Sequence, residues 1–225
     1  MELNKIYCMD CLEGMKQMED NSVDLILTDP PYNASISKIK GFGFEAINEE
    51  WDKNFNPLDF LKESERVLKQ NGSMIIFCSY HLLKTYLNYE GMKLQQIIHW
   101  YKRNSMPSLV KVYGFSIEYM LWFTRPNYIF NKKFSGKNII ISNVLQGRER
   151  TIHPTQKPLS IIRKLLKVHS NENDLILDPF MGSGTTAVAC KQLNRNFIGF
   201  ELSQKYCDIA NERLNQNNLK EWFKT

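Results

Sequence analysis

The sequence predicts an α/β fold, in which a mostly parallel β-sheet is covered by helices on both faces. Short β-branched or apolar runs alternate along the chain with segments whose apolar residues recur at helical spacing. About seven runs have the first pattern: Ile6–Met9, Val23–Thr28, Ser73–Cys78, Leu94–Tyr101, Ile117–Phe123, Leu175–Leu177 and Phe197–Phe200. Two polar motifs follow strand ends, and ligands of an open parallel sheet bind at the carboxyl ends of its strands. We therefore expect a ligand site along that edge.

Helical spacing occurs between these runs. The expected helices are Cys11–Met18, Pro57–Lys69, Tyr80–Tyr89, Pro158–His169, Thr185–Leu193 and Gln204–Leu214. Pro158 suits the first turn of a helix, where a missing backbone N–H costs nothing. A chain of 225 residues with no long linker is expected to form one domain, residues 1–225.

Composition excludes several classes of protein. The chain is 43% hydrophobic and 24% charged, which is ordinary for a globular protein. No apolar run approaches the roughly 18 residues of a membrane span, and the first ten residues lack the pattern of a signal peptide. We therefore expect no membrane partner and a cytoplasmic location. Cys8 and Cys11 have the spacing of half a zinc site, but no second pair completes it, so we expect no zinc site at these cysteines.

Two segments interrupt the alternation of strands and helices. Asn33–Glu50 contains two glycines among polar residues and predicts a mobile loop. Lys102–Arg150 carries nine Lys or Arg against two Glu, a net charge of +7 where the whole chain has +5. The candidate DNA contacts in it are Lys102, Arg103, Lys111, Lys132, Lys133, Arg148 and Arg150.

Aromatic residues are interleaved with these charges, a mixture that neutralises phosphates and stacks on bases. They are Tyr113, Phe115, Trp122, Tyr128, Phe130 and Phe134. The alternative is a solvated basic face above core aromatics, and we expect Tyr119, Leu121 and Phe123 to be core.

A glycine-rich motif, DPFMGSGTTA, begins at Asp178 directly after a strand and opens a helix. Its glycines allow a ligand to approach the backbone at the start of that helix. Glu201 ends the next strand, where a ribose-binding carboxylate belongs. Taken alone, the motif also fits a nicotinamide-dependent dehydrogenase, or close packing of the helix on the sheet.

The second motif is Asp29-Pro30-Pro31-Tyr32, at the end of another strand. Two prolines stiffen the backbone and remove two amide donors. Asp29 and the Pro30 carbonyl could accept both protons of an amine while Tyr32 stacks on the attached ring. As a methyl group arrives, positive charge grows on that nitrogen, and Asp29 would stabilise it. The alternative is a turn with an exposed aspartate.

Three motifs, DPPY, then HPTQKP at residues 153–158, then DPFMGSGTT, occur in this order. The arrangement resembles the beta group of amino-methylating DNA methyltransferases, in which the catalytic motif precedes the cofactor loop. The resemblance implies a Rossmann-like S-adenosylmethionine-dependent methyltransferase fold with a seven-stranded, mostly parallel sheet. It also implies S-adenosyl-L-methionine as cofactor, no metal, flipping of the target base, and Asp29, Pro30 and Tyr32 as catalytic residues.

The resemblance also assigns the cofactor contacts. Asp10 would contact the adenine of S-adenosylmethionine, Glu201 its ribose hydroxyls, and Lys157 its carboxylate. The full implied set is Asp10, Cys11, Asp29, His153, Thr155, Lys157, Asp178, Phe180, Gly182, Ser183, Gly184, Thr185 and Glu201. Asp10 could instead simply cap a helix, and His153 could be a loop histidine with no role.

The implied partner is double-stranded DNA, read by a basic target-recognition insertion at about residues 103–152. DPPY is more typical of enzymes that methylate N6 of adenine and SPPY of those that methylate N4 of cytosine, so cytosine stays the rival target. A cognate restriction endonuclease and a second copy of the chain are further expected partners. A dehydrogenase would leave DPPY unused, and a non-catalytic nucleic-acid-binding module would leave both motifs unused.

Overall fold

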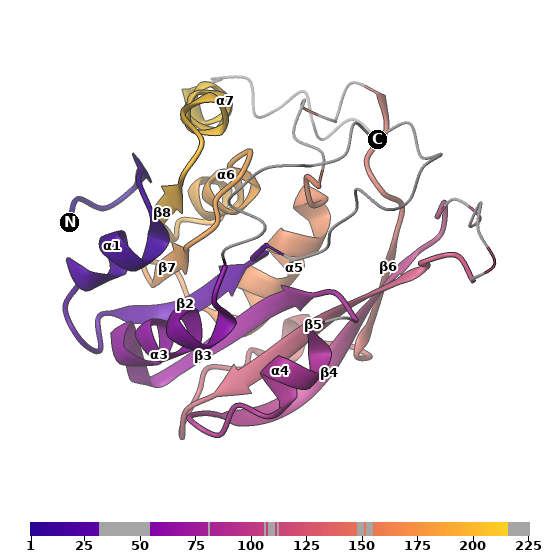
Figure 1. Ribbon diagram of the computed structural model, residues 1–225, viewed down its shortest axis with the longest axis horizontal. Helices are drawn as coiled ribbons and strands as arrows, with labels where there is room; N and C mark the ends of the chain where they lie inside the picture. Colours follow the sequence, from indigo (N-terminus) through magenta and orange to yellow (C-terminus); the bar gives the residue numbers. More distant parts are fainter. Residues whose placement is uncertain are drawn as a thin grey trace.

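The computed structural model describes residues 1–31, 55–80, 82–105, 107, 111, 113–147, 151 and 155–215. Eight described strands form one sheet in the order β1-β8-β7-β2-β3-β5-β4-β6 (Figure 1). The strands are β1 (Lys5–Cys8), β2 (Val23–Thr28), β3 (Leu68–Cys78), β4 (Lys93–Lys102), β5 (Ile117–Thr124), β6 (Ile139–Ser142), β7 (Leu175–Asp178) and β8 (Asn196–Glu201). Strand β5 is antiparallel to both of its neighbours and the remaining pairs are parallel, so the prediction of a mostly parallel sheet is confirmed.

The described part of the chain contributes eight strands to the sheet, so the expected number of seven was wrong. The additional strand is β6, which lies within the basic segment and pairs in parallel with β4. It spans four residues and only Ile140 is buried, so its sequence carries little of the alternation that marks a longer strand.

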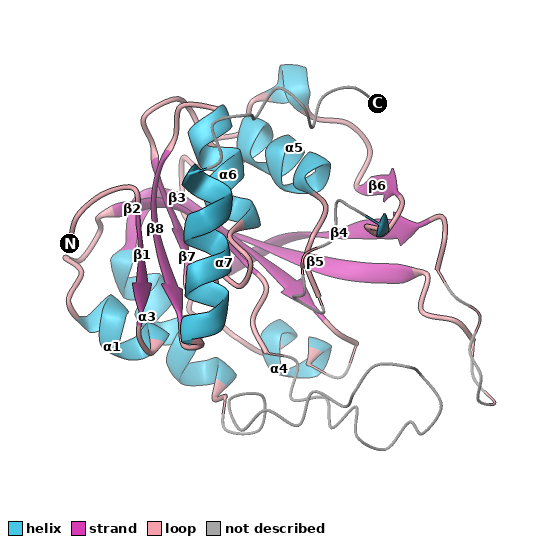
Figure 2. Ribbon diagram, turned by 90° about the horizontal axis from the view of Figure 1, so that it is seen from above, coloured by secondary structure: helices cyan, strands magenta, loops and turns pink. Residues whose placement is uncertain are grey.

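Helices cover both faces of the sheet, as predicted (Figure 2). The helices α5 (Leu159–His169), α6 (Thr185–Gln192) and α7 (Gln204–Asn215) lie on one face, and α1 (Cys11–Lys16), α3 (Pro57–Val67) and α4 (Leu83–Leu87) lie on the other. Pro158 is the N-cap of α5 and not its first helical residue. Alternate side chains of the central strands feed the two cores: Leu25 and Leu27 pack toward α5, and Ile26 packs toward α3. No described helix is long and apolar enough to cross a membrane.

Strand direction determines which residues can meet at the ligand-binding edge. The parallel strands β1, β8, β7, β2 and β3 all end at the same edge, and β5 begins there because Cys78 pairs with Tyr119. The other end of β5 therefore lies at the opposite edge. A short 3₁₀ helix, η2 (Lys132–Phe134), follows it, and the preceding Asn131 donates its backbone N–H to the Val168 carbonyl near the end of α5.

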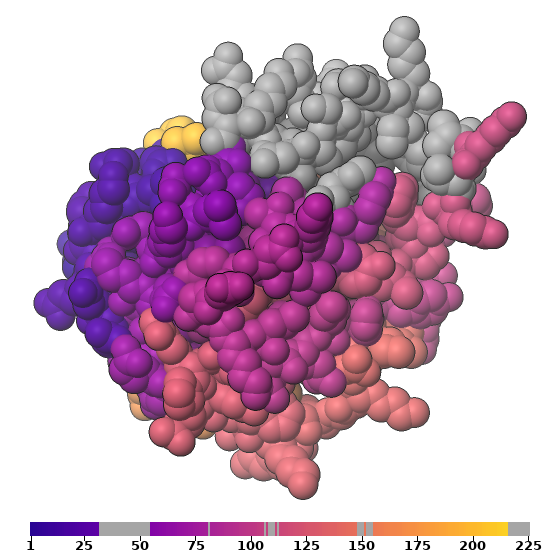
Figure 3. Space-filling view, turned by 60° about the horizontal axis from the view of Figure 1, so that its bottom comes forward, coloured from indigo at the N-terminus to yellow at the C-terminus, as the bar shows by residue number. Residues whose placement is uncertain are grey.

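This topology separates the basic segment into two parts. In the space-filling view, the residues between β5 and β6 lie along the rim away from the connection between β4 and β5 (Figure 3). Trp122, which we expected among the base-stacking aromatics, is instead buried in the core, where Phe130 stacks on it and Tyr128 meets it edge-on. Its neighbours Leu121 and Phe123 are core residues, as expected, whereas Tyr119 is only half-buried.

Candidate active site

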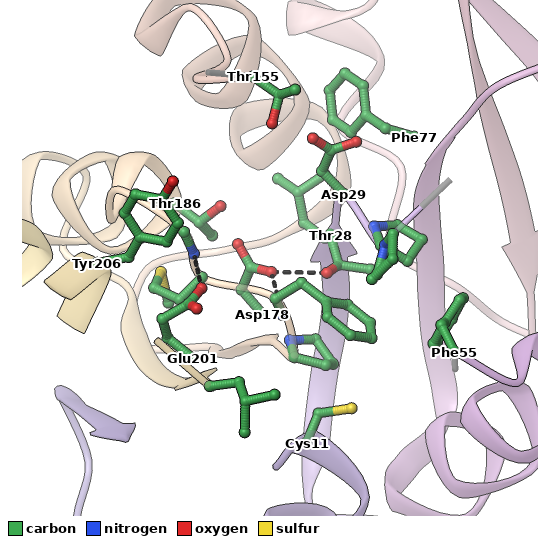
Figure 4. Close-up of a pocket in the computed structure, with 18 of the residues that line it drawn as sticks. Cys11, Thr28, Asp29, Phe55, Phe77, Thr155, Asp178, Thr186, Glu201 and Tyr206 are labelled. Carbon is green, nitrogen blue, oxygen red and sulfur yellow. Dashed lines mark hydrogen bonds between the residues drawn. The ribbon is translucent and has the colours of Figure 1, made fainter. Parts of the chain in front are cut away.

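Acidic side chains converge at the carboxyl edge of the sheet. Asp10 follows β1, Glu201 ends β8, Asp178 ends β7 and Asp29 follows β2. All four line one pocket of about 560 Å³. Figure 4 shows three of them, Asp29, Asp178 and Glu201. The expectation of a ligand site at this edge therefore corresponds to a single cavity in the structure.

Glu201 is held in a fixed orientation by two backbone N–H groups. Gly182 donates to its Oε2 at 2.8 Å and Ser203 donates to its Oε1 at 2.9 Å. Gly182 adopts a positive φ of 53°, which places its N–H against the carboxylate. Each carboxylate oxygen can accept more than one hydrogen bond, so the group suits a pair of neighbouring hydroxyls such as those of a ribose.

Gly184 has a different reason to lack a side chain. It is the N-cap of α6 with φ at 79°, and an added Cβ would lie 2.8 Å from the Cβ of Ala210 on α7. Gly184 was expected to line the methionine side of a cofactor, but the pocket wall is formed by Gly182, Ser183 and Thr185. The glycine therefore serves the start of α6 and its packing on α7.

Arg213 of α7 anchors the glycine-rich loop. Its guanidinium donates to the backbone oxygen of Ser183, to the Ser183 hydroxyl at 3.0 Å, and to the Thr185 hydroxyl at 3.3 Å. Burial lowers the pKa of Arg213 to about 10. Ser183 and Thr185 were expected to contact the cofactor, and they also hold the loop in place through this arginine.

Asp178 is a buried carboxylate at the centre of the pocket. It accepts hydrogen bonds from the Thr28 hydroxyl at 2.7 Å and from the Phe180 N–H at 3.1 Å (Figure 4). Burial raises its pKa to about 6, although these bonds and one from Thr186 act in the opposite direction. A cationic ligand in the pocket would relieve this burial cost by pairing with the ionised carboxylate.

Apolar side chains form the wall near α1 and α3. The Phe180 ring meets Phe55 edge-on at 5.2 Å between centroids, and Cys11 and Leu202 also line the pocket. Such walls suit the flat face of a base. Asp10 caps α1 by accepting from two backbone N–H groups on its Oδ1, so the capping alternative is confirmed for a residue that also lines the pocket.

Asp29 is part of an ion network that the sequence did not predict. The Lys157 ammonium lies 2.5 Å from Asp29 Oδ2 and 3.0 Å from Glu118 Oε1, and the Lys102 ammonium lies 2.7 Å from Glu118 Oε2. Burial opposes the charge on Lys157, but Asp29 and Glu118 outweigh it and raise the lysine's pKa. Lys157 was expected at a cofactor carboxylate, whereas in this structure its ammonium pairs with Asp29.

Only some of the other residues that were expected to contact the cofactor or DNA lie at the pocket. Pro30 and Thr155 line the pocket. Tyr32, His153, Arg148 and Arg150 lie outside the described residues. Among the expected DNA contacts, Lys102 pairs with Glu118, Arg103 and Lys111 are exposed in the connection after β4, and Lys132 and Lys133 lie at the opposite edge of the sheet.

Sequence reasoning missed Glu118 and Arg213. The sequence could have pointed to Glu118, because it is one of two acidic residues in a strongly basic segment and lies at the start of a strand. Arg213 carried none, because its contacts with Ser183 and Thr185 depend on how α7 packs against α6.

The pocket contains both Glu201, a carboxylate suited to ribose hydroxyls, and Asp29, a carboxylate suited to an amine, which lies two strands away in the sheet. A group carried by a nucleoside held at Glu201 can therefore reach an amine held at Asp29, as a group-transfer enzyme of Rossmann-like fold requires. Within the described ranges, no cluster of three or more His, Cys, Asp or Glu side chains could hold a metal ion.

Comparison with known families identifies the class more closely. Residues 23–212 match the N6_N4_Mtase model, described as DNA methylase. The chain therefore belongs to this family of amino-methylating DNA methyltransferases, of which the sequence motifs indicate the beta group.

Relatives support this assignment over nearly the whole chain. The type II methyltransferase M2.MboI of Moraxella bovis is 32% identical, covering 97% of this chain and 91% of the relative. The type II methyltransferase M.HinfI of Haemophilus influenzae is 33% identical over 95% of this chain and 69% of the relative. The crystal structure of the M1.HpyAVI-SAM complex is 36% identical with a TM-score of 0.75, covering 94% of this chain and 98% of that one. The PvuII cytosine-N4-specific methyltransferase, 19% identical with a TM-score of 0.78, shares the fold.

Proposed function

We propose that the chain is a site-specific DNA methyltransferase that moves a methyl group from S-adenosylmethionine to N6 of adenine in double-stranded DNA. The observation that carries the proposal is the position of Asp29 and Pro30 on the pocket that Glu201 and Gly182 also line. A methyl donor and an acceptor amine can thus meet in one cavity.

The pocket residues fit S-adenosylmethionine. Glu201 suits its ribose, the wall around Phe180 and Cys11 suits its adenine, and the buried Asp178 suits its positive charges. The bound cofactor supplies a methyl group on a sulfonium, which makes that methyl electrophilic. The relative M1.HpyAVI, at 36% identity, has a crystal structure in complex with SAM, which is the same ligand.

The Asp29-Pro30 segment prepares the amine for attack. The exocyclic amine of adenine is a poor nucleophile because its lone pair is delocalised into the ring. Two acceptors, the Asp29 carboxylate and the Pro30 carbonyl, would favour a tetrahedral nitrogen and localise that pair. On accepting that methyl group the nitrogen would become positively charged, and it would then release one of its protons to water. Asp29 stabilises the positive charge that develops in between.

DNA would approach the carboxyl edge, where Asp29 and Pro30 line the pocket. Arg103 and Lys111 are exposed in the connection after β4, and Tyr113 and Phe115 are exposed beside them. These side chains suit phosphate neutralisation and base stacking while the target base leaves the helix. The names of the type II relatives support a restriction-modification setting, with a cognate endonuclease as a partner in the cytoplasm. A homodimer stays a prediction.

Transfer of an isotopically labelled methyl group tests the proposal. The purified protein is incubated with labelled S-adenosylmethionine and DNA duplexes, and the digested nucleosides are separated. We expect label in N6-methyladenine, and Asp29→Ala as the control without label. Label found solely in N4-methylcytosine would replace the proposal by its rival. Thermal stabilisation by NAD but not by S-adenosylmethionine would favour the dehydrogenase.

A further inference from the structure

The Lys157 ammonium lies between two carboxylates at the carboxyl edge of the sheet. It lies 2.5 Å from Asp29 and 3.0 Å from Glu118, and the lysine side chain is only 9% exposed. Buried charges are costly unless they are paired, so the lysine must keep an anion wherever it moves. In the structure its ammonium contacts the carboxylates of both Asp29 and Glu118.

The Lys157 ammonium has the properties that the target amine acquires during methylation. It carries N–H donors and a positive charge, it contacts Asp29 Oδ2, and it lies 5.2 Å from the centroid of the Phe77 ring, whose face attracts cations. An incoming amine needs the same Asp29 carboxylate and would develop its charge beside a like charge. While Lys157 stays on Asp29, it therefore competes with the amine.

Glu118 offers the ammonium another position. It contacts Lys157 through Oε1 and Lys102 through Oε2, and its own side chain is 10% exposed. Burial opposes its ionisation, but Lys157 and Lys102 outweigh burial and hold the pKa of Glu118 well below its usual range. Lys157 can move toward Glu118 without leaving a buried charge unpaired.

We propose that Lys157 takes the place of the target amine at Asp29 in the free enzyme, and that Glu118 is the positioning residue that draws the ammonium away when the amine binds. This inference rests on the amine-methylating function proposed above. Glu118 acts through Lys157 and does not touch the methyl group.

Two variants separate this role from a structural one. Glu118→Gln removes the anion that competes with Asp29 for the ammonium, and its single-turnover rate should fall by about tenfold or more. Lys157→Met combined with Glu118→Gln removes both the competitor and the need for its second anion, so this double variant should be at least about fivefold faster than Glu118→Gln alone. Cofactor affinity, measured by calorimetry, should change less than about twofold in Glu118→Gln.

A binding measurement gives a readout that is independent of turnover. Duplexes carry either adenine or purine, which lacks the 6-amino group, at the target position, and S-adenosylhomocysteine replaces the methyl donor. Glu118→Gln should lower the ratio of adenine to purine affinity by about fivefold, and the double variant should restore it. Asp24→Asn is the matched control. It breaks an ion pair that does not line the pocket, in which the Lys69 ammonium lies 2.8 Å from Asp24 Oδ1, and it should leave the affinity ratio unchanged.

The comparison has outcomes that overturn the inference. A Glu118→Gln variant with the wild-type rate would do so, as would a double variant as slow as Glu118→Gln. If Glu118→Gln alone does not fold, the same substitution is made in Lys157→Met. In the Lys157→Met background, Glu118→Gln should lower the single-turnover rate by less than about twofold. A fall of about tenfold there would contradict the role assigned to Glu118. Failure of the proposed function looks different, because the wild type itself would then leave adenine unmethylated.

Discussion

Asp178→Asn should stabilise the cofactor-free protein at neutral pH. Asp178 is buried, and burial raises its pKa from the ordinary 3.8 to about 6. Asparagine has nearly the same shape and keeps an oxygen that can accept from the Thr28 hydroxyl and the Phe180 N–H. The substitution therefore removes a buried negative charge while its main hydrogen bonds can persist.

The size and pH window of the effect follow from the pKa. An acid with a raised pKa in the folded state contributes stability that is complete below its unfolded pKa and is lost as pH rises through its folded pKa. For Asp178 this window extends from 3.8 to about 6. The difference corresponds to about 3 kcal/mol at 1.36 kcal/mol per pKa unit. Asparagine avoids that loss, so the variant should gain up to about 3 kcal/mol over the wild type above pH 7 but only about 0.5 kcal/mol at pH 4.

Urea unfolding of both proteins between pH 4 and pH 8, without cofactor, measures this difference directly. An exposed aspartate of α7 provides the matched control variant, Asp208→Asn, which is measured over the same pH range. S-adenosylmethionine should bind more weakly to Asp178→Asn, because its positive charges lose the carboxylate. A stability difference that is equal at pH 4 and pH 8, or a variant less stable than wild type at pH 8, would refute this account of the buried carboxylate.

Further substitutions test Asp29, the glycine-rich loop and the surface that DNA would contact. Asp29→Ala should lower the single-turnover rate by about 100-fold or more while cofactor affinity is kept, and an equal loss in both would show a structural or cofactor-binding residue instead. Gly184→Ala should lower the free energy of unfolding by about 1–3 kcal/mol in chemical denaturation, because of its positive φ and its contact with α7, and unchanged stability would contradict this packing role. Alanine at Lys132 and Lys133 should leave the salt dependence of DNA binding unchanged. Arg103→Ala should instead reduce the slope of log affinity against log salt concentration by about one. The reverse result would place the DNA at the other edge of the sheet.

Local patterns in the sequence were sufficient to predict most of the sheet. Runs such as Val23–Thr28 and Ile117–Phe123 are long and apolar, so the strands they predict occur in the structure. Strand β6 was missed because only four residues form it and its pairing with β4 depends on a distant part of the chain. Helix α4 is shorter than its apolar spacing suggested, covering Leu83–Leu87 within the expected Tyr80–Tyr89.

The candidate site was predictable where it depends on strand ends. Asp29, Asp178 and Glu201 meet because parallel strands end at one edge, a rule that needs no coordinates. The contact between Lys157 and Glu118 depends on the register of β5 against β3 and on the start of α5, which no local pattern fixes. For the same reason, the charge of the basic segment did not reveal that its members lie at two opposite edges.

Mapping of modified bases at single-base resolution tests the central claim most directly. Plasmid DNA is isolated from cells that express the wild-type chain or Asp29→Ala, and every modified position is read. We expect N6-methyladenine at one recurring sequence with the wild type and at none with Asp29→Ala. Methylation found only at N4 of cytosine, or an unchanged adenine pattern with Asp29→Ala, would contradict it.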